Sequence, residues 1–207
     1  MDPTRALAHE LTAPLIALEI RLQRLREQPD DTAATNACID EVRSIRRILT
    51  SFIELDASDF VCDEHALEPL LERVEARFAP IALERGVRLD FATSRSHARC
   101  HPTATERVVS NLVDNAVKFA SEGGSVQVSV QDVADEVAVE VRDDGPGVAP
   151  DAAERIFQPF YRHDRERPGA GLGLAISKRL AEAQNGTLSV QSTPGQGCVF
   201  TLTLARR

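Results

Sequence analysis

Two carboxylates and two glycines follow directly after an alternating apolar segment, at residues 143–147 of the 207-residue chain. A carboxylate at the end of a strand can accept a hydrogen bond from an exocyclic amine such as that of adenine. Glycine lets the backbone approach a flat ligand closely. Asp143, Gly145 and Gly147 are therefore candidate residues for binding a base, and the same pattern also fits an ordinary turn.

Three glycines, Gly169, Gly171 and Gly173, stand where a predicted helix begins. The N–H groups at the start of a helix lack intrahelical partners and the helix dipole is positive there, so this position suits a phosphate. The dinucleotide-binding pattern G-x-G-x-x-G is not met, because the third glycine is out of register and no strand precedes closely. A phosphate-binding loop and a plain glycine-rich loop both remain open.

Another predicted helix carries Asn111, Asn115 and Lys118, which share one face because they are spaced by four and three residues. Carboxamide oxygens are hard ligands that suit Mg²⁺, and a lysine ammonium is a point charge for phosphate. The alternative is a solvated polar face, since the opposite face of this helix is apolar, with Val108 and Leu112.

His9 and Glu10 are adjacent near the N-terminus, on the flank of a predicted helix. A neighbouring carboxylate can hold one imidazole nitrogen as a donor and leave the other nitrogen as a nucleophile. Most such pairs on a helix surface have no function, so these two residues alone do not establish a reaction.

Two predicted helices must position His9. Leucines recur between Leu11 and Leu25 with the spacing of a bundle seam, and residues 42–52 repeat that spacing. The break at residues 28–32 indicates an antiparallel hairpin. Because two helices alone bury too little apolar surface, and Ile16 and Ile20 widen the stripe, we expect dimerisation into a four-helix bundle.

The other candidate segments belong to a second predicted unit, so that the domains are residues 1–58 and 59–207. Periodicity predicts helices over 65–85, 103–120 and 172–185, and strands over 87–91, 125–131, 136–142, 187–191 and 198–204. Residues 97–101 are predicted as a polar loop beside a short strand, and residues 143–171 as a long loop. Helices segregated from an antiparallel or mixed sheet indicate an α+β fold with two layers.

Composition narrows the class of protein. The 24 basic and 32 acidic residues give a formal net charge of −8, which disfavours a nucleic-acid partner. The four cysteines show no paired spacing, which argues against a disulfide framework or a zinc ribbon. The chain has neither an apolar run of membrane-spanning length nor a signal-peptide pattern. We expect a cytoplasmic chain, or the cytosolic portion of a longer one.

Taken together, these segments and residues 156–162 resemble the motifs of bacterial two-component sensor histidine kinases, in the order in which that family carries them. Residues 9–15 resemble the H box, 111–119 the N box, 143–147 the G1 box, 156–162 the F box and 169–174 the G2 box. The resemblance implies an antiparallel helical hairpin for dimerisation and phosphoacceptance, followed by a two-layer α/β sandwich of the Bergerat (GHKL) ATPase type.

The resemblance also implies a binding site for ATP and Mg²⁺. Asp143 would accept from the adenine amino group, and Asn115, helped by Asn111, would hold Mg²⁺. Lys118 and Arg162 would take phosphate oxygens. The full set of implied ATP-binding residues is Asn111, Asn115, Lys118, Phe119, Asp143, Gly145, Gly147, Phe157, Arg162, Gly169, Gly171, Leu172 and Gly173.

In the implied reaction, His9 attacks the γ-phosphorus of ATP, Glu10 orients the imidazole, and the phosphoryl group passes to an aspartate of a response-regulator receiver domain. Related ATPases carry a glutamate at the position of Asn111. Because an amide cannot activate water as a base, we expect slow hydrolysis of ATP. Ala13 stands where the family carries a hydrogen-bonding side chain used in dephosphorylation, so we expect weak or absent phosphatase activity. Both expectations rest on the resemblance.

Two other functions fit parts of the sequence. A pseudokinase or interaction module would keep the fold and the dimer, and the altered H box favours it. A serine-directed anti-sigma kinase would share the ATPase fold but lack the histidine hairpin, so the seams next to His9 count against it. Because only eight residues precede His9, we expect any sensor segment, and any membrane association, to lie outside this chain.

Overall fold

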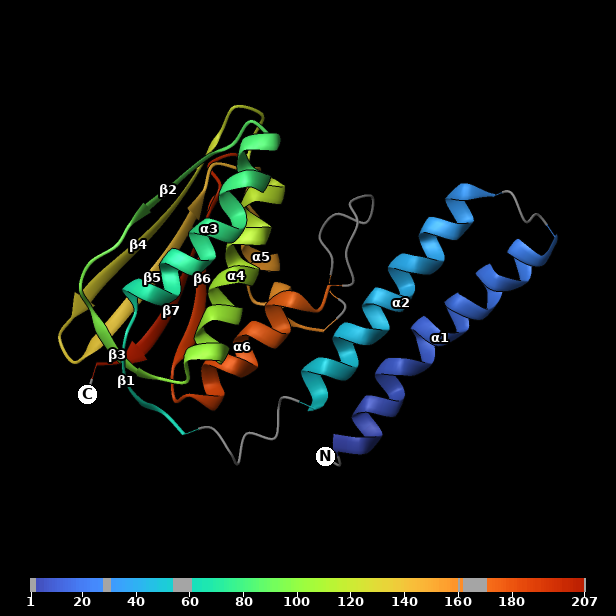
Figure 1. Ribbon diagram of the computed structural model, residues 1–207, viewed down its shortest axis with the longest axis horizontal. Coiled ribbons are helices and arrows are strands. Elements are labelled where there is room, and N and C mark those ends of the chain that lie inside the picture. The colour runs from blue at the N-terminus through green and yellow to red at the C-terminus, as the bar shows by residue number, and fades with distance from the viewer. Residues whose placement is uncertain (1–2, 28–30, 54–60, 160, 162–170, 207) are drawn as a thin grey trace. The chain divides into compact units, whose positions relative to one another are not determined.

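The computed structural model describes residues 3–27, 31–53, 61–159, 161 and 171–206. The chain divides into two compact units, Met1–Ser58 and Asp59–Arg207, and each is described by itself (Figure 1). In the described part of the chain, no helix is both long and apolar enough to cross a membrane.

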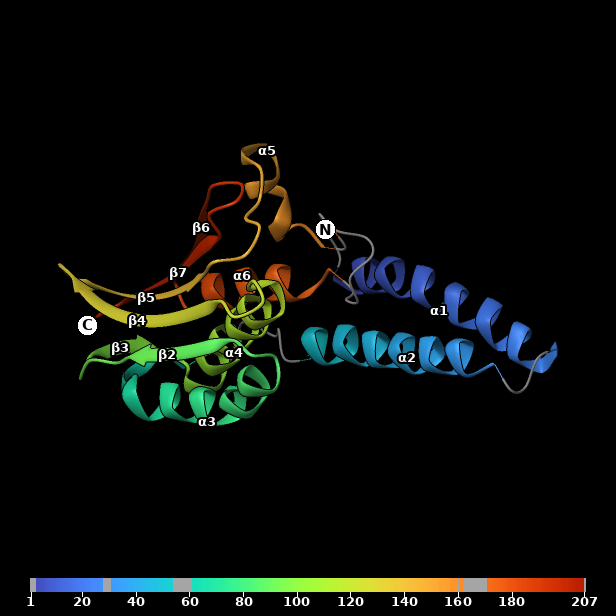
Figure 2. The same ribbon diagram turned by 90° about the horizontal axis from the view of Figure 1, so that it is seen from above.

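The first unit is a pair of helices, α1 (Pro3–Glu27) and α2 (Thr32–Ile53), which lie side by side (Figures 1 and 2). Asp31 begins α2, since its carboxylate accepts a hydrogen bond from the N–H of Ala34 at 2.9 Å. Arg21 joins the two helices by donating to the carbonyl of Ala37 at 2.9 Å. It also lies 3.5 Å from the carboxylate of Glu41.

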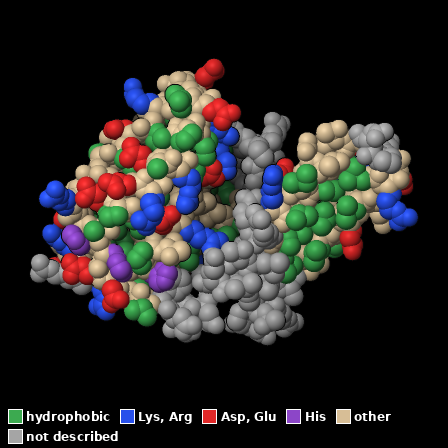
Figure 3. Space-filling view, in the orientation of Figure 1, with side chains coloured by type: hydrophobic (Ala, Val, Ile, Leu, Met, Phe, Trp, Pro, Cys, Tyr) green, Lys and Arg blue, Asp and Glu red, His purple; other side chains and the backbone are tan. Residues whose placement is uncertain are grey.

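The leucine seam of α1 is only partly covered by α2. Leu11, Leu18 and Leu25 are half-buried, whereas the intervening leucines are exposed. Hydrophobic side chains therefore gather on the surface of the hairpin (Figure 3). We call this surface the apolar hairpin face; its exposed residues are Leu15, Ile16, Ile20, Leu22, Ile39 and Val42.

The second unit combines strands and helices. Its strands are β1 (Asp63–Ala66), β2 (Arg88–Ala92), β3 (His97–Cys100), β4 (Ser125–Val133), β5 (Glu136–Asp143), β6 (Thr187–Ser192) and β7 (Cys198–Ala205). Its described helices are α3 (Glu68–Glu84), α4 (Pro102–Phe119), α5 (Pro150–Ala153) and α6 (Gly173–Ala183), with a 3₁₀ turn η2 (Arg155–Phe157).

Five strands form one sheet in the order β2-β4-β5-β7-β6, with β2 and β4 parallel and the other neighbours antiparallel. Helices α3, α4 and α6 cover one face of it (Figure 2). The core lies between these layers, where Val108 and Leu112 of α4 and Val128, Val141 and Leu202 of the sheet are buried. The α+β sandwich predicted from the sequence is confirmed.

The sequence prediction was wrong at two short segments. Residues 63–66, expected in part as the start of a helix, form β1, and residues 97–100, expected as a polar loop, form β3; the two strands pair antiparallel. Both strands are too short and polar for a clear alternating pattern. The helix starts only after Leu67, whose side chain is buried. The predicted loop over 143–171 also contains the short helix α5 and the turn η2.

Candidate nucleotide-binding site

Asp143 is the last residue of β5, and its carboxylate is buried. Oxygen Oδ1 accepts hydrogen bonds from the N–H groups of Gly145 at 2.9 Å and Cys198 at 3.3 Å. Within the described residues, Oδ2 accepts no hydrogen bond. One oxygen therefore fixes the orientation of the side chain, and the other remains available for a donor on a ligand.

The pKa of Asp143 is raised above its ordinary value, chiefly because burial disfavours the charged form. The hydrogen bonds from Gly145 and Cys198 oppose this shift, whereas the neighbouring Asp144 carboxylate adds to it. A buried carboxylate with a raised pKa is typical of functional sites, because its charge gains most when a ligand supplies a donor.

The loop after Asp143 is packed between two other parts of the sheet domain. Gly145 lies against the carbonyl of Phe119, at the end of α4, so closely that a Cβ would collide with it. On the other side, the carbonyl of Pro146 accepts from Gly195 at 2.8 Å, and Ser192 Oγ accepts from the N–H of Val148 at 2.8 Å. The sequence analysis assigned Gly145 to close approach of a ligand. In the structure, its lack of a side chain allows close contact with the protein's own backbone.

Gly147 follows in the same loop with a φ of 66°, a backbone conformation that side chains other than glycine rarely adopt. A Cβ there would also collide with the carbonyl of Thr193. The loop can therefore pass this turn only because the residue is glycine.

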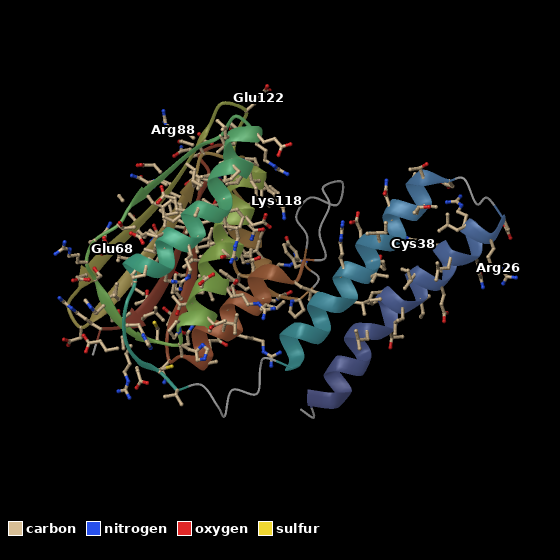
Figure 4. All side chains as sticks on the ribbon, in the orientation of Figure 1. Arg26, Cys38, Glu68, Arg88, Lys118 and Glu122 are labelled. Carbon is tan, nitrogen blue, oxygen red and sulfur yellow. The ribbon has the colours of Figure 1, made fainter. Side chains whose placement is uncertain are left out.

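Asn115 and Lys118 lie on the last turns of α4 (Figure 4 labels Lys118). The carboxamide of Asn115 is half-buried and makes no hydrogen bond within the described part of the chain. Lys118 pairs with Asp114, four residues earlier on the same helix. A ligand phosphate would therefore compete with Asp114 for the ammonium group. Phe119, at the C-terminal end of the helix, is 37% exposed and can contact a ligand.

Asn111 connects α4 to α6. Its Nδ2 donates to Ser177 Oγ at 3.0 Å, and Ser177 is buried. Gly173 lies so close to Asn111 Oδ1 that a Cβ at that position would collide with it. The carboxamide of Asn111 is thus oriented by α6, whereas that of Asn115 has no such partner. The role of Ser177 in orienting Asn111 was not predicted from the sequence, because no motif identifies this serine.

The first turn of α6 has the features of an anion site. Leu172 is buried at the N-cap position and supplies no side-chain acceptor, so the first N–H groups of the helix lack a side-chain cap. Gly171 precedes it with a φ of 68°. Of the remaining predicted residues, Gly169 and Arg162 lie outside the described part of the chain.

Phe157 ends η2 and packs into the domain. Its ring meets that of Phe200 edge-on, with centroids 6.5 Å apart. Lys178 Nζ from α6 lies 5.4 Å from the centroid of the Phe157 ring. The aromatic predicted as an ATP contact is therefore held by β7 and α6. Lys178 was not predicted as a site residue, and its one signal is that it is one of only two lysines in the chain.

His9 and Glu10 belong to α1, but their side chains are outside the described part of the structure. Their predicted roles therefore rest on the sequence.

The described residues contain no group of three or more His, Cys, Asp or Glu side chains that could hold a metal ion. A Mg²⁺ ion commonly takes only one or two protein ligands when nucleotide phosphates supply the rest. The half-buried carboxamide of Asn115, which makes no hydrogen bond to the described residues, fits that arrangement. Asn111 offers only an oxygen that is already in contact with α6.

Comparison with known proteins agrees with this geometry. Residues 100–207 match the family described as histidine kinase-, DNA gyrase B- and HSP90-like ATPases. The chain is 29% identical to the alginate biosynthesis sensor protein KinB of Pseudomonas aeruginosa, covering 95% of this chain and 35% of that protein. It thus spans about a third of the length of this relative.

Solved structures align over nearly the whole chain. The histidine kinase AdeS of Acinetobacter baumannii aligns with a TM-score of 0.76 at 20% identity, covering 96% of this chain and 98% of that one. The histidine kinase ThkA, solved in complex with the response regulator protein TrrA, aligns with a TM-score of 0.73 at 23% identity. That alignment covers 99% of this chain and 61% of the other.

Proposed function

The chain belongs to the histidine kinase-, DNA gyrase B- and HSP90-like ATPase family, and on that premise we propose that it is the core of a sensor histidine kinase. In this proposal the sheet domain binds ATP, and the γ-phosphoryl group is transferred to His9 of the helical hairpin. The phosphoryl group then passes to an aspartate on the receiver domain of a response regulator.

The observation that carries ATP binding is the arrangement of the Asp143 carboxylate. Asp143 is a buried residue; its Oδ1 is held by two backbone N–H groups, and its Oδ2 accepts no hydrogen bond from the described residues. An adenine amino group is a donor that would satisfy this oxygen, and Phe119 at the adjacent helix end could pack on the ring. Lys118 and the start of α6 would then take the phosphates.

Mg²⁺ would neutralise charge on the β- and γ-phosphates when bound. Asn115 would hold it, because its carboxamide is half-buried and makes no hydrogen bond within the described residues. Asn111 would support this ligand less directly, since its carboxamide is oriented by Ser177.

Phosphoryl transfer depends mainly on positioning and on charge neutralisation. One imidazole nitrogen of His9 forms a bond to the γ-phosphorus while the bond from that phosphorus to the bridging oxygen of ADP breaks. Glu10 orients the imidazole and takes its proton. The products are ADP and a phosphohistidine, whose phosphoryl group is then transferred to the carboxylate of the regulator.

We further propose that two copies of the chain form a homodimer through the apolar hairpin face. Six large apolar residues on this face are exposed in the single chain, and such a patch on a two-helix hairpin marks an interaction surface. A second hairpin with the same face would complete a four-helix bundle. The response-regulator partner is supported by ThkA, which was solved in complex with such a protein.

The test is transfer of ³²P from γ-labelled ATP to the purified chain. We expect an acid-labile, alkali-stable label, as a phosphohistidine gives, and loss of this label in His9→Gln. The Asp143→Ala variant should lose both label and nucleotide binding. A wild-type chain that binds ATP and the regulator but acquires no label would contradict the kinase reaction and favour the pseudokinase.

A further inference from the structure

Asp144 lies beside the base-binding carboxylate, and nothing in the proposed function requires its side chain. It is exposed and follows Asp143 in the chain. Both of its carboxylate oxygens nevertheless accept hydrogen bonds from a different part of the domain, the turn between α4 and β4 and the first residue of β4. This turn comprises residues 120–124, and Glu122 marks it in Figure 4.

The contacts enclose the turn from both of its ends. Oδ1 of Asp144 accepts from the N–H of Ser121 at 3.2 Å, and Oδ2 accepts from the N–H of Ser125 at 2.7 Å. Ser125 Oγ lies 3.4 Å from Oδ2, and Ser121 Oγ donates to the carbonyl of Asp144 at 3.0 Å. A Cβ on Gly124 would occupy the position of this carboxylate. The turn and the side chain are therefore shaped to one another.

These contacts connect two parts of the candidate ATP site. Ser121 comes two residues after Phe119 and three after Lys118, at the end of α4, and Asp144 is covalently next to Asp143. The packing of Gly145 against the carbonyl of Phe119 holds the same two segments together. The Asp144 contacts thus fix the end of α4 relative to the carboxylate of Asp143, which is proposed to bind the base.

We propose that Asp144 is a positioning residue for nucleotide binding, which holds the α4–β4 turn so that Asp143 and the end of α4 contact the same adenine. The inference rests on the proposed ATP site and goes beyond it, because it assigns a role to a side chain that does not touch the nucleotide. Bonds from N–H groups to a charged acceptor are stronger than neutral ones, so the connection is firm even at the surface.

The test measures the dissociation constants of ATP and GTP, the melting temperature and the steady-state autophosphorylation kinetics of five variants. For Asp144→Ala we expect a roughly tenfold weaker affinity for ATP, since two charge-assisted bonds are lost. The preference for ATP over GTP should narrow as well, because guanine lacks the amino group that Asp143 would read. Uniform weakening of nucleotide binding raises KM and leaves kcat within about twofold.

Two variants test whether the contact itself matters. Asp144→Asn keeps the size of the side chain but places an amino group against one of the two N–H donors, so it should lose part of the affinity. Gly124→Ala should displace the carboxylate and mimic Asp144→Ala. The double variant Asp144→Ala/Gly124→Ala should bind ATP no more weakly than either single variant, because both changes remove the same contact.

His101→Ala is the matched control. The Nδ1 of His101 accepts from the N–H of Ala104 at 3.3 Å and caps the opposite end of the same helix. Its loss should lower the melting temperature by about 4 °C, as expected for about 1 kcal/mol in a domain of this size, and leave nucleotide affinity unchanged.

The outcomes separate the two proposals. If the wild-type chain binds no ATP, the proposed function fails and this inference fails with it. If the wild-type chain binds ATP and Asp144→Ala keeps both its affinity and its preference over GTP, only the positioning role is overturned. An affinity loss in His101→Ala as large as that in Asp144→Ala would also overturn it, because general destabilisation would then explain the effect.

Discussion

Lys178 places its ammonium 5.4 Å from the centroid of the Phe157 ring. A cation over an aromatic ring contributes about 0.5–1 kcal/mol at exposed sites and about 2 kcal/mol when desolvated. Lys178 is half-buried. The contact therefore helps to hold Phe157 against Phe200.

Replacement of Lys178 by Met should lower the melting temperature by a few degrees and raise KM for ATP, because Phe157 loses the cation that holds its ring. Lys178→Arg keeps a cation over the ring and should restore most of both properties. Arg179→Met is the matched control, since Arg179 is exposed on the same helix. Equal effects of Lys178→Met and Arg179→Met would show that loss of charge, not the contact, is responsible.

Asp143→Asn should stabilise the ligand-free domain and abolish nucleotide binding. Burial raises the pKa of Asp143 in the folded state, so its ionisation destabilises the fold at neutral pH. That cost disappears as pH falls through the raised pKa and is absent below the ordinary value of about 4. Asparagine keeps Oδ1 for Gly145 and Cys198 but turns an amino group toward the adenine amine.

Melting temperatures of Asp143→Asn and wild type, compared between pH 8 and pH 4 without nucleotide, test this sign. The melting temperature of the variant should exceed that of wild type most at pH 8, and the difference should shrink as pH falls. A constant difference over the whole range would mean that the charge of Asp143 costs the fold nothing.

Hydrolysis of ATP should be very slow when the phosphoacceptor is removed. In His9→Ala the only remaining acceptor is water, and Asn111 cannot act as a base to activate it. Its carboxamide is in addition oriented by Ser177. Phosphate release from ATP by this variant should fall well below the wild-type rate in the presence of a regulator. Steady release at the wild-type rate would contradict the expectation.

Dephosphorylation of the phosphorylated regulator should be weak, because Ala13 has no side chain that can orient a water molecule. Ala13 is exposed on α1, so Ala13→Thr adds a hydroxyl without disturbing packing. We expect this variant to speed loss of the phosphoryl group from the regulator, followed as release of ³²P. Ala13→Val, which has nearly the same shape as threonine, should not.

Dimerisation should fail when charge is placed on the apolar hairpin face. Ile20 is 61% exposed in the single chain, so Ile20→Asp should leave the hairpin folded while opposing burial against a second copy. Sedimentation should then report a monomer, whereas Glu19→Asp at the neighbouring exposed position should remain dimeric. A wild-type chain that sediments as a monomer at micromolar concentration would contradict the dimer itself.

Much of the fold follows from periodicity in the sequence. The long elements, such as α4 and the β4–β5 pair, were predicted close to their limits because their apolar residues repeat with a clear period. The strands β1 and β3 were missed, since each has four residues and is recognisable only through its partner. Pairing over more than thirty residues of chain leaves no local signal.

The sequence by itself determined which residues could take part in chemistry, because His9, Asn115, Lys118, Asp143 and the glycines are recognisable from type and spacing. Tertiary structure decided how they are held. It placed two backbone N–H groups on Asp143 Oδ1, turned Asn111 toward Ser177, and tied Asp144 to the turn after α4. Apart from Gly145, these partners come from segments distant in the chain. A backbone N–H or a serine hydroxyl looks the same in any sequence until the fold brings it within hydrogen-bond distance.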